Sequence, residues 1–143
     1  MYAIITGGAR GLGEGMALRL AKMGYHIVIN YISDGSAAKA EAVLEKASTE
    51  YGVKGLAVQA DVSEYEGAKK LVDAAVEKFG KEVGVLINNA GIQQNAYYLD
   101  TPIEKIHRIV QVNLVSAMNM CTLVAPIMKE NNNRIIKIGR AHV

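Results

Sequence analysis

The 143-residue sequence predicts a single α/β domain, a three-layer sandwich in which a doubly wound parallel sheet of about five strands lies between helices. Two observations indicate this class. Short apolar runs alternate with longer stretches of helical periodicity, and the runs are almost continuously hydrophobic, as in parallel strands covered on both faces. Half of the residues are hydrophobic, which is enough for one ordinary core at this length. We therefore expect one domain spanning residues 1–143.

The individual elements are predicted from the periodicity and from the residues that end each run. The expected strands are 2–5, 26–30, 54–60, 83–89 and 135–138, and the expected helices are 12–23, 36–51, 63–79 and 102–130. Gly24 and Gly80 stand where helices end. Ser63 and Glu66 have the spacing of a capping box, which predicts the start of the third helix. The fourth helical stretch is apolar nearly all round.

The composition argues against several classes of protein. Sixteen basic and 14 acidic residues are mixed along the chain for a net charge of +2, without the basic patch that nucleic acids require. No signal-peptide pattern opens the chain and no run approaches the roughly 20 apolar residues of a membrane span, so we expect a cytoplasmic protein with no membrane partner. Cys121 is predicted to pack in the interior. His26, His107 and His142 lack metal-ligand spacing, so no metal site is predicted.

The turn after the first strand reads TGGARGLG, from Thr6 to Gly13, and opens directly into the first helix. In that context Gly7 allows a tight turn, Gly11 lets the backbone approach a pyrophosphate, and Gly13 allows close packing of the helix. The helix N-terminus adds free N–H groups and a positive dipole end. Glycine clusters also serve turns that hold no ligand, but the preceding strand and the following helix favour a dinucleotide site.

The end of the second strand bears on which dinucleotide would bind. A carboxylate that grips the adenosine ribose is expected about 20 residues after the turn, and the sequence has Asn30 and Tyr31 there. Arg10, within the turn, carries a guanidinium suited to a forked contact with a 2′-phosphate. These residues favour NADP(H) over NAD(H). In the alternative interpretation Arg10 is a solvated loop residue, and Asp34, just past the strand, reaches back to the ribose.

With these motifs in order, the sequence resembles the short-chain dehydrogenase/reductase family over nearly its whole length. TGGARGLG is similar to the family's cofactor turn, DVS (61–63) to its adenine-contacting segment, NNAG (88–91) to its sheet-stabilising motif, and Asn113 in QVNLVSA to its helix-borne catalytic asparagine. The resemblance implies a Rossmann-type fold that is C-terminally truncated here. The residues that it assigns to the cofactor are Thr6, Gly7, Arg10, Gly11, Leu12, Gly13, Asn30, Tyr31, Asp61, Val62, Asn89, Ala90 and Gly91.

The later motifs also have roles that physical chemistry can state. Asp61 can accept a hydrogen bond from an adenine amino group, and the small residues Ala90 and Gly91 let the backbone pass beside a ribose. Asn113 lies in an apolar helix, where an amide without a partner costs about 1–3 kcal/mol. Its partner is a neighbouring backbone carbonyl or, as the resemblance implies, a water relay towards a catalytic lysine. A local kink in the helix is compatible with both.

The resemblance implies an NADP(H)-dependent oxidoreductase that transfers hydride between nicotinamide and a carbonyl or hydroxyl substrate, small or carrier-bound, with 3-oxoacyl reduction as the candidate reaction. In the family a serine follows the fifth strand, where this sequence has Arg140, and a catalytic tyrosine and lysine would come beyond Val143. We therefore expect the chain alone to be inactive and the full-length protein to form a homo-oligomer. The alternative is a dinucleotide-binding module without catalysis. Tyr65 and Lys69 have the catalytic spacing, but they open the helix after the third strand and are predicted to be an exposed first turn.

Overall fold

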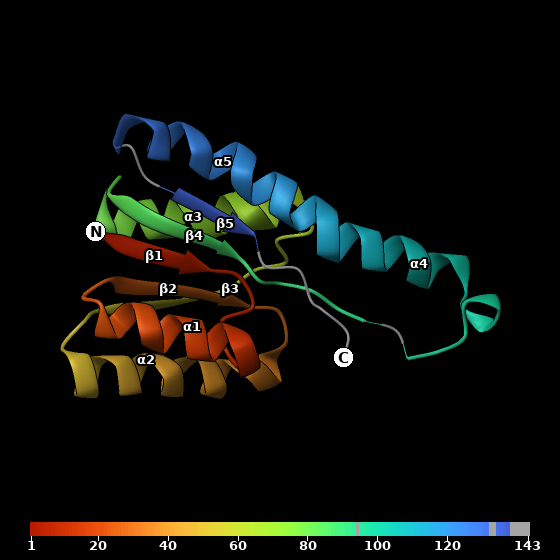
Figure 1. The fold of residues 1–143 in the computed structure, drawn as a ribbon, viewed down its shortest axis with the longest axis horizontal. Helices are drawn as coiled ribbons and strands as arrows, with labels where there is room; N and C mark the ends of the chain where they lie inside the picture. The colour runs from red at the N-terminus through yellow and green to blue at the C-terminus, as the bar shows by residue number, and fades with distance from the viewer. Residues whose placement is uncertain (94, 132–133, 138–143) are drawn as a thin grey trace.

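The fold is a parallel sheet between two helical layers, as Figure 1 shows for the computed structural model, which describes residues 1–93, 95–131 and 134–137. The five described strands are β1 (Tyr2–Ile5), β2 (His26–Tyr31), β3 (Gly55–Gln59), β4 (Val83–Asn88) and β5 (Arg134–Lys137). They run in the order β3-β2-β1-β4-β5, and every neighbouring pair is parallel. The predicted α/β class and doubly wound sheet are confirmed.

Helices cover both faces of the sheet. On one face α1 (Gly11–Lys22) packs against α2 (Ala37–Tyr51), and on the other α3 (Tyr65–Phe79) packs against α5 (Ser116–Asn131). A helix α4 (Ile103–Val110) continues through a π-helical segment, η3 (Gln111–Val115), into α5. The predicted helix over 102–130 is therefore present with a local change of pitch. Figure 1 shows α4 extending beyond the body of the sheet. Two short 3-10 turns, η1 (Asp34–Ser36) and η2 (Tyr98–Asp100), lie in the connections.

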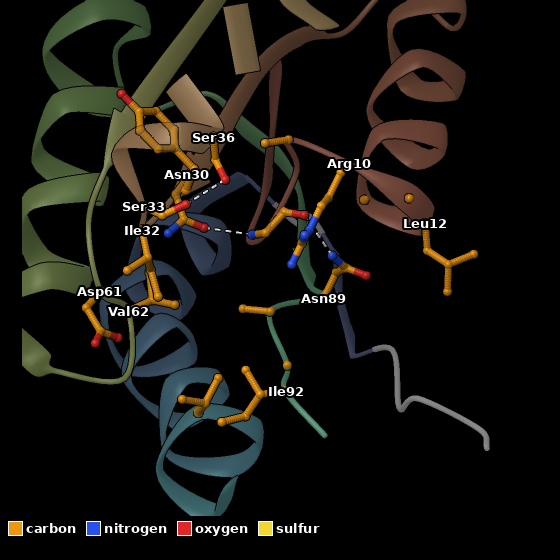
Figure 2. A pocket seen from close by; sticks show the side chains of 18 of the residues that line it. Arg10, Leu12, Asn30, Ile32, Ser33, Ser36, Asp61, Val62, Asn89 and Ile92 are labelled. Carbon is orange, nitrogen blue, oxygen red and sulfur yellow. Dashed lines mark hydrogen bonds between the residues drawn. The ribbon is translucent and has the colours of Figure 1, made fainter. Parts of the chain in front are cut away.

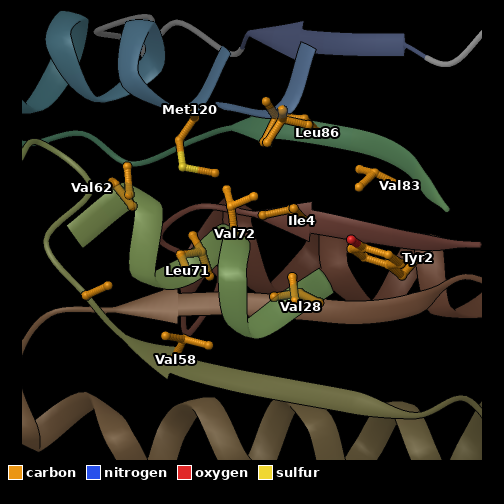
Figure 3. Packing of buried hydrophobic residues seen from close by; sticks show 14 of the residues in the cluster. Tyr2, Ile4, Val28, Val58, Val62, Leu71, Val72, Val83, Leu86 and Met120 are labelled. Atoms are coloured by element: carbon orange, nitrogen blue, oxygen red, sulfur yellow. The ribbon is translucent and has the colours of Figure 1, made fainter. Parts of the chain in front are cut away.

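The core consists of two apolar layers, one on each face of the sheet. Because successive strand residues point to opposite faces, Tyr2 and Ile4 of β1 pack with α3 and α5, whereas Ala3 and Ile5 pack with α1 and α2. All four side chains are buried. Figure 3 shows Ile4 among side chains of the neighbouring strands and of α3 and α5. Burial on both faces makes β1 the centre of the molecule and fixes the position of its carboxyl end.

The chain changes its direction across the sheet on either side of β1. Ile5 at the end of β1 is level with Ile29 of β2 and with Ile87 of β4. The loops that follow these three strands therefore start side by side at the carboxyl edge of the sheet. Ligands of open α/β sheets bind at such a switch point. The topology thus brings the glycine-rich turn and the NNAG segment to one place.

The start of α3 differs from the prediction. The helix begins at Tyr65, its N-cap residue is Glu64, and no side chain caps it. The Ser63 hydroxyl instead donates to Asp61 Oδ1 at 2.6 Å. The predicted capping box of Ser63 and Glu66 is therefore wrong, because a carboxylate two residues earlier competes for the hydroxyl more strongly than a backbone N–H does.

One helix in the described ranges, Ile103–Met128, is long and apolar enough to cross a membrane by length and composition alone. The expectation that no run approaches roughly 20 apolar residues stands, because Glu104, Lys105 and Asn113 interrupt this stretch and only its length and mean hydropathy meet the test. A core helix of a soluble protein meets it as well, and here Met120, Val124 and Met128 are buried in the layer shared with α3 and β4. Packing against the sheet therefore accounts for only part of the apolar character of this helix.

Candidate functional site

A pocket of about 660 Å³ lies where β1, β2, β3 and β4 end (Figure 2). It contains all the residues predicted to bind the cofactor except Thr6. These lining residues are Gly7, Arg10, Gly11, Leu12, Gly13, Asn30, Tyr31, Asp61, Val62, Asn89, Ala90 and Gly91. The sequence analysis missed the others, which are Ala9, Ile32, Ser33, Ser36, Ile92, Gln93 and Val112. Segments as far apart in the chain as Gly7 and Val112 thus share one cavity.

The glycine-rich turn requires glycine for two different reasons. Gly7 and Gly11 have φ values of 64° and 56°, in the left-handed region that side chains disfavour. At Gly13 the reason is space, because a Cβ there would lie 2.3 Å from the Gly7 carbonyl oxygen and 2.7 Å from Asn89 Nδ2. The first turn of α1 therefore packs directly against the backbone of the loop that precedes it, as predicted for Gly13.

Thr6 lies beneath the pocket and holds the two halves of the site together. Its buried Oγ1 accepts hydrogen bonds from the backbone N–H of Asn89 at 3.0 Å and of Ala90 at 2.9 Å. In return Asn89 Nδ2 donates to the Thr6 carbonyl at 2.9 Å and to the Gly7 carbonyl at 3.2 Å. These four bonds lock the NNAG segment onto the glycine-rich turn. Thr6 does not line the pocket and instead holds the segments that do.

Asn30 at the end of β2 uses both ends of its amide within the protein. Its Oδ1 accepts from the Gly7 backbone N–H at 2.8 Å, and its Nδ2 donates to the Ala60 carbonyl at 2.8 Å. The side chain is 1% exposed. Asn30 therefore ties the glycine-rich turn to the ends of β2 and β3, and it stands, within the described ranges, where a carboxylate would grip a ribose.

The surface beyond β2 is polar and partly unpaired. Asp34 Oδ1 accepts from Gln59 Nε2 at 2.7 Å, and Asp34 does not line the pocket. The hydroxyls of Ser33 and Ser36, 2.8 Å apart, do line it, together with Arg10. The Arg10 side chain is exposed and its guanidinium has no hydrogen bond or ion pair with the described residues. One guanidinium and two hydroxyls are thus available at this end of the pocket.

Asp61 is held by a network that the sequence analysis did not identify. Its Oδ1 accepts from the Ser63 backbone N–H at 3.0 Å and from the Ser63 hydroxyl, and its Oδ2 accepts from Arg108 Nη2 at 2.7 Å. Burial raises the pKa of the Asp61 carboxyl, but the hydrogen bonds from Ser63 and Arg108 and the charge of Arg108 outweigh it, so the pKa lies below its usual value. Asp61 is therefore a charged acceptor near neutral pH.

Asn113 lies in the π-helical segment and clasps the chain after NNAG. Its Oδ1 accepts from the Ile92 backbone N–H at 2.7 Å and its Nδ2 donates to the Ile92 carbonyl at 2.8 Å. The amide thus has a backbone partner, and the helix has the local irregularity that was expected. A π-helical turn inside a helix is frequent at functional sites. The catalytic role of Asn113 stays a prediction, because the residues it would relay to are not described here.

The remaining sequence candidates lie away from the pocket. Lys69 forms an ion pair with Asp73 on the surface of α3, and Tyr65 is exposed at its start, so this pair is an ordinary first turn. Cys121 is half-buried against the core and accepts a long hydrogen bond from Asn88. Among the residues that the structure describes, no group of three His, Cys, Asp or Glu could hold a metal. The expectations for residues 140 and 142 lie outside the described residues.

A parallel doubly wound sheet with a glycine-rich turn at its switch point defines the Rossmann class of α/β domain. A family model described as short chain dehydrogenase matches residues 1–141. The chain is 34% identical over 137 residues to the 3-oxoacyl-[acyl-carrier-protein] reductase FabG of Staphylococcus epidermidis, covering 95% of this chain and 54% of that protein. It is 39% identical over 145 residues to the L-rhamnose 1-dehydrogenase (NADP(+)) of Thermoplasma acidophilum, covering 99% and 56%. The chain belongs to the short-chain dehydrogenase family.

Solved structures agree with this assignment. The alcohol dehydrogenase from the archaeon Thermococcus sibiricus complexed with 5-hydroxy-NADP superposes with a TM-score of 0.88 at 26% identity, over 95% of this chain and 56% of that one. A blue fluorescent protein from a metagenomic library in complex with NADPH gives 0.88 at 30% identity, over 96% and 55%. The chain spans about half the length of the relatives that it matches.

Proposed function

We propose that the chain forms the cofactor half of an NADP(H)-dependent oxidoreductase. The observation that carries the proposal is the adenosine end of the pocket, where Arg10, Ser33 and Ser36 offer a guanidinium and two hydroxyls and no carboxylate lines the end of β2. A 2′-phosphate needs such donors, whereas a free ribose hydroxyl is normally gripped by an acidic side chain. The alcohol dehydrogenase and the blue fluorescent protein of similar fold are complexed with 5-hydroxy-NADP and NADPH, which supports the same cofactor class.

The alternative in which Asp34 grips the ribose has less support. Its carboxylate accepts a hydrogen bond from Gln59 and lies outside the pocket lining. The position of Arg10, Ser33 and Ser36 in the pocket lining and the engagement of Asp34 with Gln59 therefore support a preference for NADP(H).

The pyrophosphate and the nicotinamide ribose of the cofactor also fit the pocket. The first backbone N–H groups of α1 lie beside Gly11 and Leu12, where a helix N-terminus stabilises a pyrophosphate. Ala90 and Gly91 border the same cavity and leave space for the nicotinamide ribose. When bound, the nicotinamide would supply or accept the hydride, and the protein would orient it towards a carbonyl or hydroxyl group.

For the substrate we propose a carbonyl compound, small or carrier-bound, with 3-oxoacyl reduction as the first candidate reaction. This choice is supported by the 34% identity to FabG over 95% of the chain. The 39% identity to a sugar dehydrogenase makes a polyol or sugar the first competitor. In assays of the full-length protein, a dinucleotide-binding protein without catalysis would bind NADPH and oxidise it with neither substrate class, whereas an oxidoreductase would oxidise it with one of them.

We further propose a cytoplasmic homo-oligomer assembled through the long helix. Ile103, Val110, Leu114 and Met118 are each about half exposed or more, and their spacing places them along one side of α4, η3 and α5. An exposed apolar stripe of this kind is typical of an interface. Light scattering of the wild type and of a Leu114→Lys variant tests this, with a smaller particle expected for the variant.

The cofactor proposal is tested by titrating NADPH and NADH while following nicotinamide fluorescence. The wild type should bind NADPH more tightly, and Arg10→Gln should weaken NADPH binding roughly tenfold, as expected for a lost charge-assisted hydrogen bond, with little change for NADH. Arg19→Gln removes the same charge from the exposed last turns of α1 and should change neither value. Equal affinity of the wild type for both nucleotides, or equal weakening of both by Arg10→Gln, would contradict the proposal.

A further inference from the structure

Arg108 of α4 joins the adenine end of the pocket to the long helix. Its Nη2 donates to Asp61 Oδ2 at 2.7 Å, and its Nη1 donates to the Ser63 hydroxyl at 2.7 Å. Asp61 lines the pocket, whereas Arg108 is not among the lining residues of the described chain. A planar guanidinium that holds two groups of one loop fixes their orientation as well as their position. Arg108 therefore acts on the pocket from outside it.

The backbone of the same loop is held separately. Gln111 Nε2 donates to the Ser63 carbonyl at 2.8 Å, and Asn119 Nδ2 donates to it at 3.2 Å. On the other side α3 packs closely, since a Cβ on Gly67 would lie 2.1 Å from the Asp61 carbonyl oxygen. The loop backbone is thus fixed by neighbours on two sides. Arg108 differs from these contacts because it holds the side chains of the loop.

We propose that Arg108 is a positioning residue for adenine recognition, which orients the Asp61 carboxylate so that it accepts a hydrogen bond from the adenine amino group. This inference rests on the proposed function, because it requires a dinucleotide in the pocket. Ser63 occupies Oδ1 with two hydrogen bonds, and Arg108 occupies one direction of Oδ2. A carboxylate oxygen has two lone pairs, so Oδ2 keeps one acceptor site. Without Arg108 only the two bonds at Oδ1 hold the carboxylate, so the direction of the acceptor site on Oδ2 is less fixed.

The experiment compares NADPH with its hypoxanthine analogue, in which a carbonyl oxygen replaces the adenine amino group. Both nucleotides carry the same reduced nicotinamide, so the same fluorescence signal can be followed in a separate titration of each to obtain its dissociation constant. The wild type should prefer NADPH about tenfold, the value expected for one hydrogen bond to a charged group. Arg108→Gln should bring the ratio of the two constants close to one. Arg108→Lys, which keeps the charge but lacks the fork, should give an intermediate ratio.

The ratio distinguishes positioning from a general loss of structure. A loosened fold would weaken both nucleotides and leave the ratio as in the wild type. Lys105→Gln removes a positive charge from an exposed position one turn away on α4 and should leave the ratio unchanged. An unchanged ratio in Arg108→Gln, or no preference in the wild type, overturns the inference. Failure of the wild type to bind either nucleotide overturns the proposed function itself, so the two failures are distinguishable.

Discussion

Replacement of Gly13 by alanine should destabilise the protein although alanine is the better helix former. The new Cβ would lie 2.3 Å from the Gly7 carbonyl oxygen, so that oxygen must move by about 1 Å to reach an ordinary contact distance. The same oxygen accepts a hydrogen bond from Asn89, which the shift would weaken. Gly13→Ala therefore disturbs the turn and the segment that is locked to it.

The change in the free energy of unfolding is the sum of one stabilising and two destabilising contributions. Alanine in place of glycine inside a helix gains about 1 kcal/mol. Overpacking against a backbone costs about 1–3 kcal/mol, and the weakened Asn89 bond costs about 1 kcal/mol more. From the middle of the packing range, we expect a net loss of about 2 kcal/mol. At about 3 °C per kcal/mol for a chain of this size, the melting temperature should fall by roughly 6 °C.

Gly15→Ala is the matched control, since Gly15 lies in the same helix and its Cβ would meet nothing within 4 Å. This variant should gain about 0.5–1 kcal/mol and melt higher than the wild type. Thermal unfolding followed by circular dichroism measures both variants, and an NADPH titration should show weaker binding for Gly13→Ala alone. If the two substitutions stabilise the protein equally, the close approach between α1 and the turn is not real and the reasoning is refuted.

Two further perturbations probe the support of the site and the opposite end of β1. Thr6→Val removes the acceptor for the Asn89 and Ala90 N–H groups and should lower the free energy of unfolding by about 2 kcal/mol. Thr6→Ser keeps the hydroxyl and should retain most of that stability. Urea denaturation measures both variants, and equal losses would contradict the role of the hydroxyl. Burial raises the pKa of Tyr2, whose hydroxyl donates to the Gly80 carbonyl, to about 12. Because the folded pKa exceeds the unfolded value near 10, this stabilising contribution is complete below pH 10 and is lost as the pH rises towards 12. Tyr2→Phe should therefore lose less stability than the wild type over that interval, and parallel curves would show that Tyr2 does not contribute.

The sheet could be predicted because each strand carries its own signal. A nearly continuous apolar run such as Tyr2–Ile5 indicates burial on both faces, and alternation with helices leaves few topologies for parallel strands. The pocket residues followed from the same reasoning, since strand ends converge at a switch point. The hydrogen bonds that those residues make could not be predicted in this way. Asn30 was assigned to the cofactor, and its amide proved to be engaged with Gly7 and Ala60.

The contacts around Ser63 show where local reasoning stops. The spacing of Ser63 and Glu66 is a correct capping pattern, but the hydroxyl bonds to Asp61 and accepts from Arg108, which is 45 residues away in the chain. No local sequence pattern predicts a hydrogen-bond partner at that separation. For Asn113 the need for a hydrogen-bond partner could be predicted, because an amide in an apolar helix requires a partner wherever that partner lies. Its backbone partner, Ile92, is 21 residues away and became evident only in three dimensions.

The bonds from Thr6 to the NNAG segment also bear on how the protein is made. Thr6 and Asn89 are 83 residues apart, and β1 gains its second neighbour only when β4 arrives. At about 5–20 residues per second, roughly 4–17 s of synthesis separate these two residues on the ribosome. During that time one edge of β1 is unpaired, and long-range pairing of this kind is intrinsically slow to form. A nucleotide that requires both segments can therefore stabilise the domain only after Asn89 has been made, and it cannot assist the chain before that point.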